Sequence, residues 1–128
     1  MTSPGKTKVL VVDNEAEFGA TLAARLRLSN FETKSVCSGA EALAALALFQ
    51  PDVILLDLQM PDMTGLDVLA QVKTTDPTIE VILLTGHGSF DVGISSMQLG
   101  AFDYIFKPVD LTSLIDRISD AYEKRKGR

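Results

Sequence analysis

The 128-residue sequence predicts an α/β fold in which helices cover both faces of a doubly wound parallel sheet. Three observations support this fold class. Short apolar runs typical of strands alternate about five times with segments of helical periodicity. The connections between these segments are short, as expected when helices join parallel strands. Several runs contain almost no polar residue, which is typical of strands buried on both faces.

The first strand is expected at residues 8–13, where an apolar run ends on Asp13. Helical spacing follows over residues 16–28, because large apolar residues recur at intervals of four. Residues 31–36 alternate in polarity, which favours a second strand at the edge of the sheet. The inward face expected for the helix is made by Phe18, Leu22 and Leu26.

A second helix is expected to open at Ser38 and to close before Pro51, which cannot continue a helix. Residues 53–56 form the third strand, an unbroken apolar run. Thr64 is a suitable N-cap for a third helix, which breaks at Asp76 before a proline. The inner faces expected for these two helices are Leu43, Leu46 and Ala47, and Leu66, Leu69 and Val72.

Residues 80–85 form the fourth expected strand. The helix expected over 89–99 has poor intrinsic propensity, because it contains glycine and two serines, and Gly100 suits its C-terminal end. A short fifth strand is expected at 103–107. Asp110 then caps the last helix, whose apolar stripe is Leu111, Leu114, Ile115, Ile118 and Tyr122.

Composition narrows the functional class. The net charge of −5 argues against a bulk nucleic-acid binder, which normally carries a basic excess. The single cysteine, Cys37, cannot form an internal disulfide and is expected to serve packing. Residues 1–7 lack the apolar core of a signal peptide, and no run approaches the roughly 18 apolar residues of a membrane span. We therefore expect a cytoplasmic domain without membrane contact.

Four of the five expected strands end on a chemically capable residue: Asp13, Asp57, Thr85 and Lys107. Taken alone, each has a plain structural explanation, such as a helix cap for Asp13 or a solvated surface side chain for Lys107. The carboxyl ends of parallel strands meet at one edge of a sheet, however, so these side chains are expected to converge. Their joint placement favours a functional site.

Carboxylate oxygens suit Mg²⁺, a hard cation that keeps several waters and bridges to phosphate. A lysine charge and a threonine hydroxyl complete a holder for phosphoryl oxygens. An aspartate in such a holder, here Asp57, can itself be the nucleophile that forms an acyl phosphate. The sequence thus predicts phosphoryl transfer, which needs mainly positioning and charge neutralisation.

These residues stand in motifs that resemble the response-regulator receiver domain of two-component phosphorelay systems. The motifs are Val-Leu-Val-Val-Asp at 9–13, Leu-Leu-Asp-Leu-Gln-Met-Pro-Asp-Met-Thr-Gly at 55–65, Leu-Leu-Thr-Gly-His-Gly at 83–88 and Phe-Asp-Tyr-Ile-Phe-Lys-Pro at 102–108. The resemblance covers residues 8 to about 124. It implies a CheY-like, flavodoxin-like (βα)5 fold with strand order 2-1-3-4-5.

The resemblance implies that Asp57 accepts a phosphoryl group from a sensor histidine kinase. It places Asp13, Asp57 and the backbone carbonyl of Gln59 around Mg²⁺ or Mn²⁺. It also places Thr85 and Lys107 against the phosphoryl group. The chain would therefore be a signalling switch that assists its own phosphorylation and dephosphorylation, and not an enzyme.

The resemblance also implies how the signal is read. Tyr104 matches an aromatic switch residue that fills the space vacated when Thr85 moves toward the phosphoryl group. The Lys107–Pro108 peptide bond is expected to be cis. The weak helix over 89–99 is the expected movable element, so the readout is expected on the face formed by helix 4, strand 5 and helix 5.

Three positions, Asn14, Gln59 and His87, bear on how well the site binds a cation and how fast it reacts. The family usually has two adjacent acids after the first strand, and here the second is Asn14, so we expect weaker Mg²⁺ binding with phosphorylation retained. Glu15 compensates for the missing charge or else points into the start of the helix. Gln59 and His87 match positions that tune rate in the family, although His87 also suits an exposed loop.

The expected organisation is a flexible N-terminus at 1–7, a receiver domain at 8–124 and a basic tail or start of a linker at 125–128. The expected partners are a sensor histidine kinase and an output domain or target protein, which could be a DNA-binding module. A phosphorylation-dependent homodimer is a further expectation.

Alternative functions remain open from the sequence. A pseudo-receiver that only docks partners is supported by Asn14. An aspartyl-phosphate hydrolase is disfavoured, because the general acid expected two residues after the nucleophile is replaced by Gln59. A flavin-binding flavodoxin is disfavoured by the acidic turn at 13–15, where a phosphate cradle would need Ser, Thr and Gly.

Overall fold

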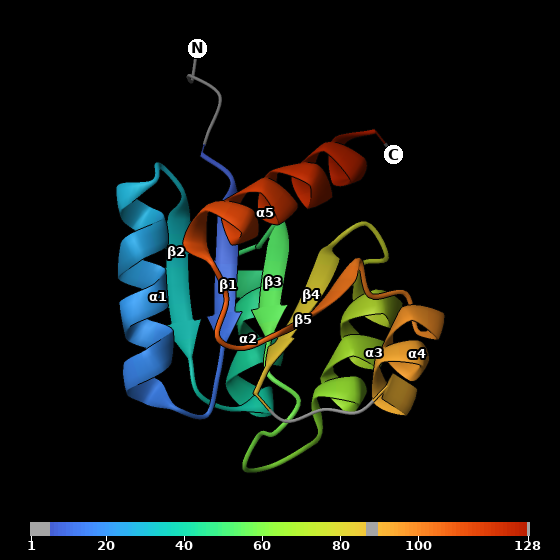
Figure 1. Ribbon diagram of the computed structural model, residues 1–128. Helices are drawn as coiled ribbons and strands as arrows, with labels where there is room; N and C mark the ends of the chain where they lie inside the picture. The colour runs from blue at the N-terminus through green and yellow to red at the C-terminus, as the bar shows by residue number, and fades with distance from the viewer. Residues whose placement is uncertain (1–5, 87–89, 128) are drawn as a thin grey trace.

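The computed structural model describes residues 6–86 and 90–127. In this part of the chain, five parallel strands form one sheet in the order β2-β1-β3-β4-β5 (Figure 1). The chain reverses its winding direction between β1 and β3, so the point at which ligands bind in such sheets lies between these two strands. The strands are β1 Lys8–Val12, β2 Glu32–Val36, β3 Val53–Leu56, β4 Glu80–Thr85 and β5 Asp103–Phe106.

Helices cover both faces of this sheet, as the sequence predicts. One apolar core lies between the sheet and α1 and α5, and a second lies between the sheet and α2 and α3. α4 packs beside α3 and next to β5 (Figure 1). No described helix is long and apolar enough to cross a lipid bilayer. The helices are α1 Ala16–Leu28, α2 Gly39–Leu48, α3 Gly65–Thr75, α4 Phe90–Gln98 and α5 Leu111–Lys126.

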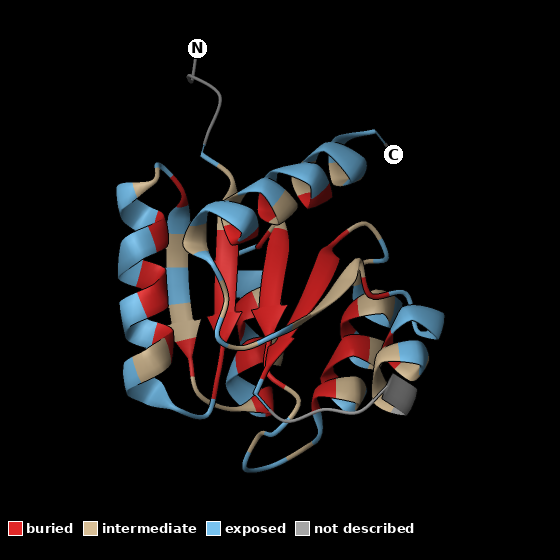
Figure 2. Ribbon diagram, viewed as in Figure 1, coloured by how far each residue is buried: buried red, intermediate tan, exposed pale blue. Residues whose placement is uncertain are grey.

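The central strands are buried on both faces, which explains their unbroken apolar runs. Every residue of β3 and of β4 is buried, and Figure 2 shows β1 with the same character. β2 differs, because Glu32 and Lys34 are exposed and alternate with half-buried residues. This alternation confirms the prediction that the second strand lies at the edge of the sheet.

The inner face expected for α2 was partly wrong. The residues that α2 buries are small ones, including Ala42 and Ala45, which let the helix lie close to its neighbours. Leu43 and Leu46 are half-buried at the border of the core, and Ala47 is exposed. Because most of the helix is apolar, its hydrophobic pattern alone does not define which side faces inward.

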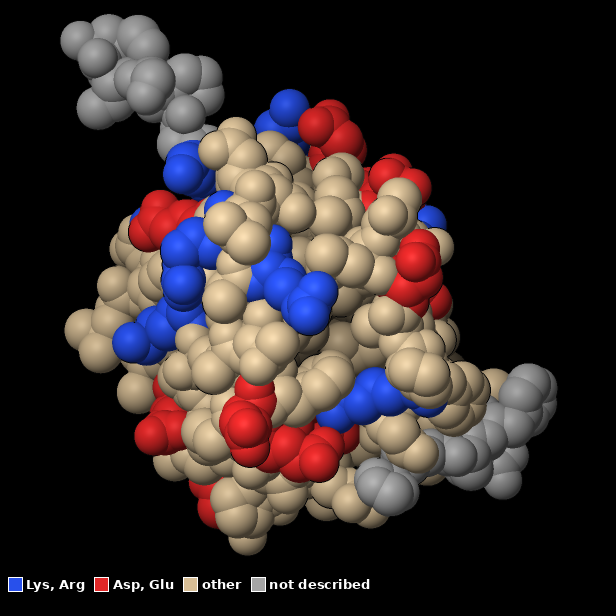
Figure 3. Space-filling view, turned by 60° about the vertical axis from the view of Figure 1, so that its left-hand side comes forward, with Lys and Arg blue, Asp and Glu red and all other residues tan. Residues whose placement is uncertain are grey.

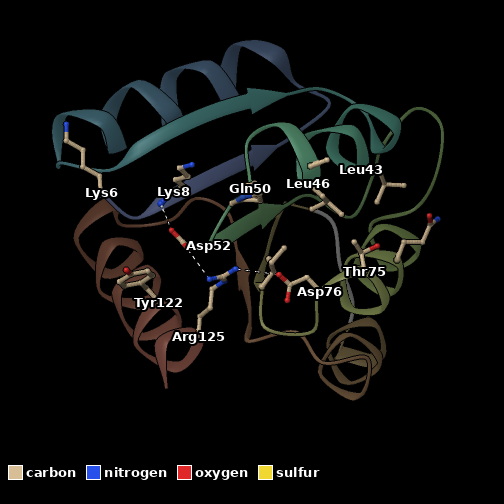
Figure 4. Close-up of a pocket in the computed structure, with 14 residues that line it drawn as sticks. Lys6, Lys8, Leu43, Leu46, Gln50, Asp52, Thr75, Asp76, Tyr122 and Arg125 are labelled. Atoms are coloured by element: carbon tan, nitrogen blue, oxygen red, sulfur yellow. Dashed lines mark hydrogen bonds and ion pairs between the residues drawn. The ribbon is translucent and has the colours of Figure 1, made fainter. Parts of the chain in front are cut away.

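The amino-terminal edge of the sheet carries a pocket of about 790 Å³ (Figure 4). Ion pairs connect its walls: Arg125 near the end of α5 lies 3.3 Å from Asp52 and 3.5 Å from Asp76. Asp52 also accepts the backbone N–H of Lys8 at 2.8 Å. The last turn of α5 is therefore joined to the starts of β1 and β3 and to the end of α3.

Candidate functional site

The four polar residues at the strand ends lie together along the carboxyl edge of the sheet. Asp13 directly follows β1, and its N–H donates to Val36 O at 3.1 Å. Asp57 follows β3, and its N–H donates to Val12 O at 2.9 Å. Thr85 ends β4. These backbone hydrogen bonds extend the sheet past its last formal strand residues and hold both aspartates in register.

Lys107 is the central charge of the cluster. Its Nζ lies 2.7 Å from Asp13 Oδ2 and 3.8 Å from Asp57 Oδ2. Glu15 adds a third carboxylate, with Oε1 at 3.5 Å, but this side chain is largely exposed. The ring of Phe18, one turn into α1, lies beneath the ammonium, with its centroid 4.0 Å from Nζ. The lysine is therefore held by acids and by an aromatic face.

Burial strengthens the electrostatics of this cluster, because charges removed from water are screened less. Asp13 is 3% exposed and Asp57 is 5% exposed. Burial alone would lower the pKa of Lys107, but the hydrogen bond to Asp13 and the charges of Asp13, Asp57 and Glu15 outweigh it. The pKa of Lys107 is thus raised above its usual 10.5, and the side chain stays protonated at neutral pH.

Thr85 and Lys107 are fixed to each other through the backbone. The N–H of Lys107 donates to Thr85 O at 2.8 Å, which continues the pairing of β4 with β5. The Thr85 side chain is fully buried, and the Lys107–Pro108 peptide bond is cis. The hydroxyl and the ammonium therefore come from neighbouring positions at the same edge of the sheet.

The loop after Asp57 returns closely on itself. The N–H of Gln59 approaches Asp57 Oδ1 at 3.4 Å, and the N–H of Gly65 donates to Leu58 O at 2.7 Å. A Cβ on Gly65 would lie only 2.5 Å from Asp57 O, so no other residue fits this close approach. Glycine is therefore required at the first position of α3, because the backbone of Asp57 passes so close to it.

The second position of the acidic turn, Asn14, carries no charge. Asn14 is exposed, and Glu15, at the N-cap of α1, has its carboxylate beside Lys107. Among the residues that the structure describes, no group of three or more His, Cys, Asp or Glu side chains is arranged to hold a metal ion. The buried acids at this edge of the sheet are Asp13 and Asp57, and Glu15 adds an exposed carboxylate beside them.

Tyr104 lies on β5 and packs against α4. Its ring lies beside Gly93 and meets the ring of Phe106 edge-on, with centroids 5.2 Å apart. These residues line an apolar pocket of about 580 Å³, to which Ile94 and Met97 also contribute. His87 lies outside the described residues.

Two contacts of the site were not anticipated from the sequence. Phe18 was expected only as a core residue of α1, yet its ring contacts the lysine. Its position in the first turn of α1, which begins next to the carboxyl edge of the sheet, was the one sequence feature that could have indicated this contact. Asp62 had no expected role, but its carboxylate binds the first turn of α2. Nothing in the local sequence around Asp62 indicates that distant helix.

The surface charge on one face of the molecule is mixed. On the face shown in Figure 3, basic side chains are bordered by acidic ones, so no single sign of charge extends over it. The net charge of the whole chain is −5, whereas a domain that binds nucleic acid normally carries a basic excess.

Comparison with known proteins gives a consistent family. Residues 9–119 match the model of the response regulator receiver domain. The chain is 37% identical over 127 residues to the transcriptional regulatory protein PrrA of Mycobacterium tuberculosis, covering 99% of this chain and 53% of PrrA. It is 37% identical over 121 residues to the DNA-binding transcriptional regulator NtrC of Escherichia coli, covering 92% of this chain and 26% of NtrC.

Solved structures show the same likeness. A response regulator receiver domain protein from Clostridium thermocellum has a TM-score of 0.88 and 34% sequence identity, with 94% of this chain and 97% of that one aligned. The chain thus matches that receiver domain over nearly its full length. In contrast, it spans about half the length of PrrA and about a quarter of NtrC.

Proposed function

Since this chain belongs to the response-regulator receiver family, we propose that Asp57 accepts a phosphoryl group from a sensor histidine kinase. The observation that carries the proposal is the position of Lys107 Nζ, 2.7 Å from Asp13 Oδ2 and 3.8 Å from Asp57 Oδ2. A nearly buried carboxylate beside a fixed ammonium can act as a nucleophile toward phosphorus. The same ammonium can then bind the phosphoryl oxygens.

In the proposed step, one carboxylate oxygen of Asp57 forms a bond to phosphorus. The bond from phosphorus to the donor imidazole nitrogen breaks, and its electron pair stays on that nitrogen. Lys107 moves its charge from the acid pair toward the new phosphoryl oxygens, and the Thr85 hydroxyl donates to one of them. Positioning and charge compensation are the main requirements of this chemistry.

The oxygen donors of the site suit Mg²⁺ or Mn²⁺, with most of the remaining ligands supplied by water. Asp13 Oδ1 and Asp57 Oδ1 each accept a backbone N–H, at 2.9 and 3.4 Å, and retain lone pairs for a cation. We assign Asp13, Asp57 and the Gln59 carbonyl as ligands, with Asn14 as a weaker contributor. When bound, the cation offsets the negative charge of the incoming phosphate.

The test is incubation with acetyl phosphate and Mg²⁺, followed by intact-mass measurement. We expect the mass of one phosphoryl group to be added, as an acid-labile label, and to be lost in Asp57→Asn. A wild-type protein that takes up no label would overturn the proposal. A label that persists in Asp57→Asn would reject Asp57 as the acceptor.

We propose that phosphorylation is read at the face formed by α4, β5 and α5. Ile94, Met97 and Phe106 expose large apolar surface there, which is typical of a protein-binding surface. On β5, Phe106 is paired with Thr85 and its ring contacts the ring of Tyr104, so a shift of Thr85 is able to change this surface. Backbone amide NMR shifts with a phosphate mimic test this, and unchanged shifts at α4 and β5 would contradict it.

The names of two relatives suggest what kind of process this receiver controls. PrrA is named a transcriptional regulatory protein and NtrC a DNA-binding transcriptional regulator. By analogy, we propose that this receiver controls a DNA-binding output domain or a separate target, with phosphorylation-dependent dimerisation as one route. A histidine kinase as donor implies a cytoplasmic location. Size exclusion before and after phosphorylation measures the dimerisation directly.

Gln59 and His87 are proposed to tune how quickly the acyl phosphate is hydrolysed. Gln59 is exposed and lies two residues after Asp57, so its side chain is able to reach water that approaches the phosphoryl group. The rate of label loss in Gln59→Ala and in His87→Ala measures each contribution.

A pseudo-receiver that docks partners without phosphorylation is the second candidate. It is favoured by Asn14 and by the absence, within the described residues, of a three-acid group that would hold a metal. The acetyl phosphate experiment separates the two, because a pseudo-receiver takes up no label.

A further inference from the structure

The loop between β3 and α3, residues 57–64, projects beyond the carboxyl edge of the sheet and lies near the start of α2 (Figure 1). Its base is fastened by the Gly65 N–H, which donates to Leu58 O at 2.7 Å, and by a bridge between Gln59 and Thr64. These bonds close the base of the loop but do not reach its tip at residues 60–63. The tip needs another attachment if Gln59 is to keep one position.

Asp62 provides that attachment. Its two carboxylate oxygens accept the N–H groups of Gly39 and Ala40, each at 2.9 Å. The neighbouring Met63 side chain lies directly over Gly39, where a Cβ would come within 2.3 Å of it. The tip of the loop therefore contacts the first turn of α2 through both a charge and an apolar side chain.

The first turn of α2 is capped from two sides. Ser38 Oγ accepts the N–H of Glu41 at 3.1 Å, and Glu41 Oε1 accepts the N–H of Cys37 at 2.8 Å. Ser38 and Glu41 thus cap the helix start from within the helix's own sequence, in an arrangement that resembles a capping box but uses the N–H of Cys37. Asp62, from a different segment, accepts two further N–H groups of the first turn, those of Gly39 and Ala40, at the end of the helix where negative charge is favoured.

These contacts close a ring around the acid pair. α2 begins shortly after β2, and the last residue of β2, Val36, accepts the N–H of Asp13 at 3.1 Å. Asp57 is tied to the other side, because its N–H donates to Val12 O at 2.9 Å. The path from Asp13 through β2, α2 and Asp62 returns along the loop to Asp57. A displacement of the loop tip is therefore opposed at both aspartates.

We propose that Asp62 is a positioning residue, which fixes the loop after Asp57 to the start of α2 and so holds the Gln59 backbone at the cation site. This inference rests on the proposed function, because it assigns the Gln59 carbonyl as a ligand. The two bonds from Gly39 and Ala40 also lower the pKa of Asp62, so its carboxylate stays ionised at neutral pH.

The sharpest test compares Asp62→Ala with Ser38→Ala. Both variants remove a cap from the same helix end, but only the first releases the loop. We expect Asp62→Ala to weaken Mg²⁺ binding by about tenfold, in the range found for groups that orient a metal ligand. Ser38→Ala is expected to keep the wild-type Kd. Isothermal calorimetry with MgCl₂ measures both.

A readout without metal tests the positioning directly. In the metal-free protein, the amide of Gln59 is expected to exchange with solvent faster in Asp62→Ala than in Ser38→Ala, while amides of β3 stay unchanged. Asp62→Asn keeps one acceptor oxygen and is expected to give an intermediate Kd and exchange rate. Gly39→Ala places a Cβ where the Met63 side chain lies and forces that side chain to move. This change on the α2 side of the contact is also expected to speed exchange of the Gln59 amide.

The outcomes separate this inference from the proposed function. A wild-type protein that binds no Mg²⁺ and takes no label overturns the proposed function. If the wild type does both, an Asp62→Ala variant that matches Ser38→Ala in Kd and in Gln59 exchange overturns the positioning role alone. Loss of Mg²⁺ binding in Ser38→Ala equal to that in Asp62→Ala would assign the effect to helix stability and would also overturn it.

Discussion

At the scale of single residues, Lys107 determines the charge balance of the site. Its ammonium lies within 4 Å of the carboxylates of Asp13, Asp57 and Glu15, so it offsets part of the negative charge of a nearly buried acid pair. A cation that binds between the aspartates competes with this lysine for their oxygens. The affinity for Mg²⁺ therefore depends on how many further negative charges stand nearby.

Asn14 is where such a charge is missing. We expect Asn14→Asp to tighten Mg²⁺ binding by about tenfold, equivalent to about 1.4 kcal/mol, because a further carboxylate is added beside the acid pair. The rate of labelling at saturating Mg²⁺ is expected to change little. Calorimetric titration of both proteins measures the difference, and equal affinities would contradict the weakened site.

Phe18 is expected to stabilise the charged lysine. Its ring centroid is 4.0 Å from Nζ, and such a contact contributes on the order of 1 kcal/mol when partly removed from water. A double-mutant cycle of Phe18→Leu and Lys107→Met, measured by urea unfolding, should give a coupling of about that size. The control is Phe31→Leu, because Phe31 lies at the other end of the sheet and should show a coupling near zero with Lys107→Met.

At the scale of secondary-structure elements, the two ends of the sheet have different tasks. The carboxyl edge gathers the candidate functional residues, while the amino edge joins helices to strands through ion pairs. Arg125 on α5 contacts Asp52 before β3 and Asp76 after α3 (Figure 4). The last turn of α5 is therefore fixed at the end of the molecule opposite the proposed phosphorylation site.

Asp76 should make stability depend on pH in the acid range. Hydrogen bonds from the Thr78 hydroxyl, at 2.6 Å, and the Thr78 N–H, together with the charges of Arg125 and Lys73, lower the pKa of Asp76 below 3.8 despite its partial burial. A group with a lowered pKa in the folded state stabilises the fold above its unfolded pKa. That contribution is lost as pH falls through the folded value.

We therefore expect Asp76→Asn to be less stable than the wild type at pH 7 and to lose less stability between about pH 5 and about pH 2. Urea unfolding at several pH values measures the slope. Thr78→Val, which removes the donor hydroxyl, is expected to show part of the same effect. If the unfolding free energy of Asp76→Asn fell with decreasing pH as steeply as that of the wild type, Asp76 would not be the source of the pH dependence.

At the scale of the whole molecule, cation binding and folding are linked. Unfolding separates Asp13 from Asp57, so Mg²⁺ should bind the folded state far better than the unfolded chain. At a hundredfold excess over Kd, the free energy of unfolding is expected to rise by about 2.7 kcal/mol, and a chelator should reverse the gain. Thermal and urea unfolding measure it. Asp13→Asn should lose most of the response, and an equal response there would place the cation elsewhere.

The arrangement of strands and the convergence of Asp13, Asp57, Thr85 and Lys107 were predictable, because a parallel sheet brings all carboxyl ends to one edge. The contacts of Phe18 and Asp62 were not, because they depend on how α1 lies over the edge and on the path of a loop. Ala47 was assigned to the wrong side of α2, since Leu and Ala are both apolar and the pattern does not distinguish them. Local patterns predict elements better than contacts between them.

The polar edge strand has a consequence for behaviour in concentrated solution. A strand at the border of a sheet has unpaired backbone groups that can recruit a strand from another molecule and begin aggregation. β2 exposes Glu32 and Lys34. Charged side chains on an edge strand are one of the features by which proteins discourage such pairing. We therefore expect the polar β2 to oppose edge-to-edge association of the sheet, in addition to marking the limit of the core.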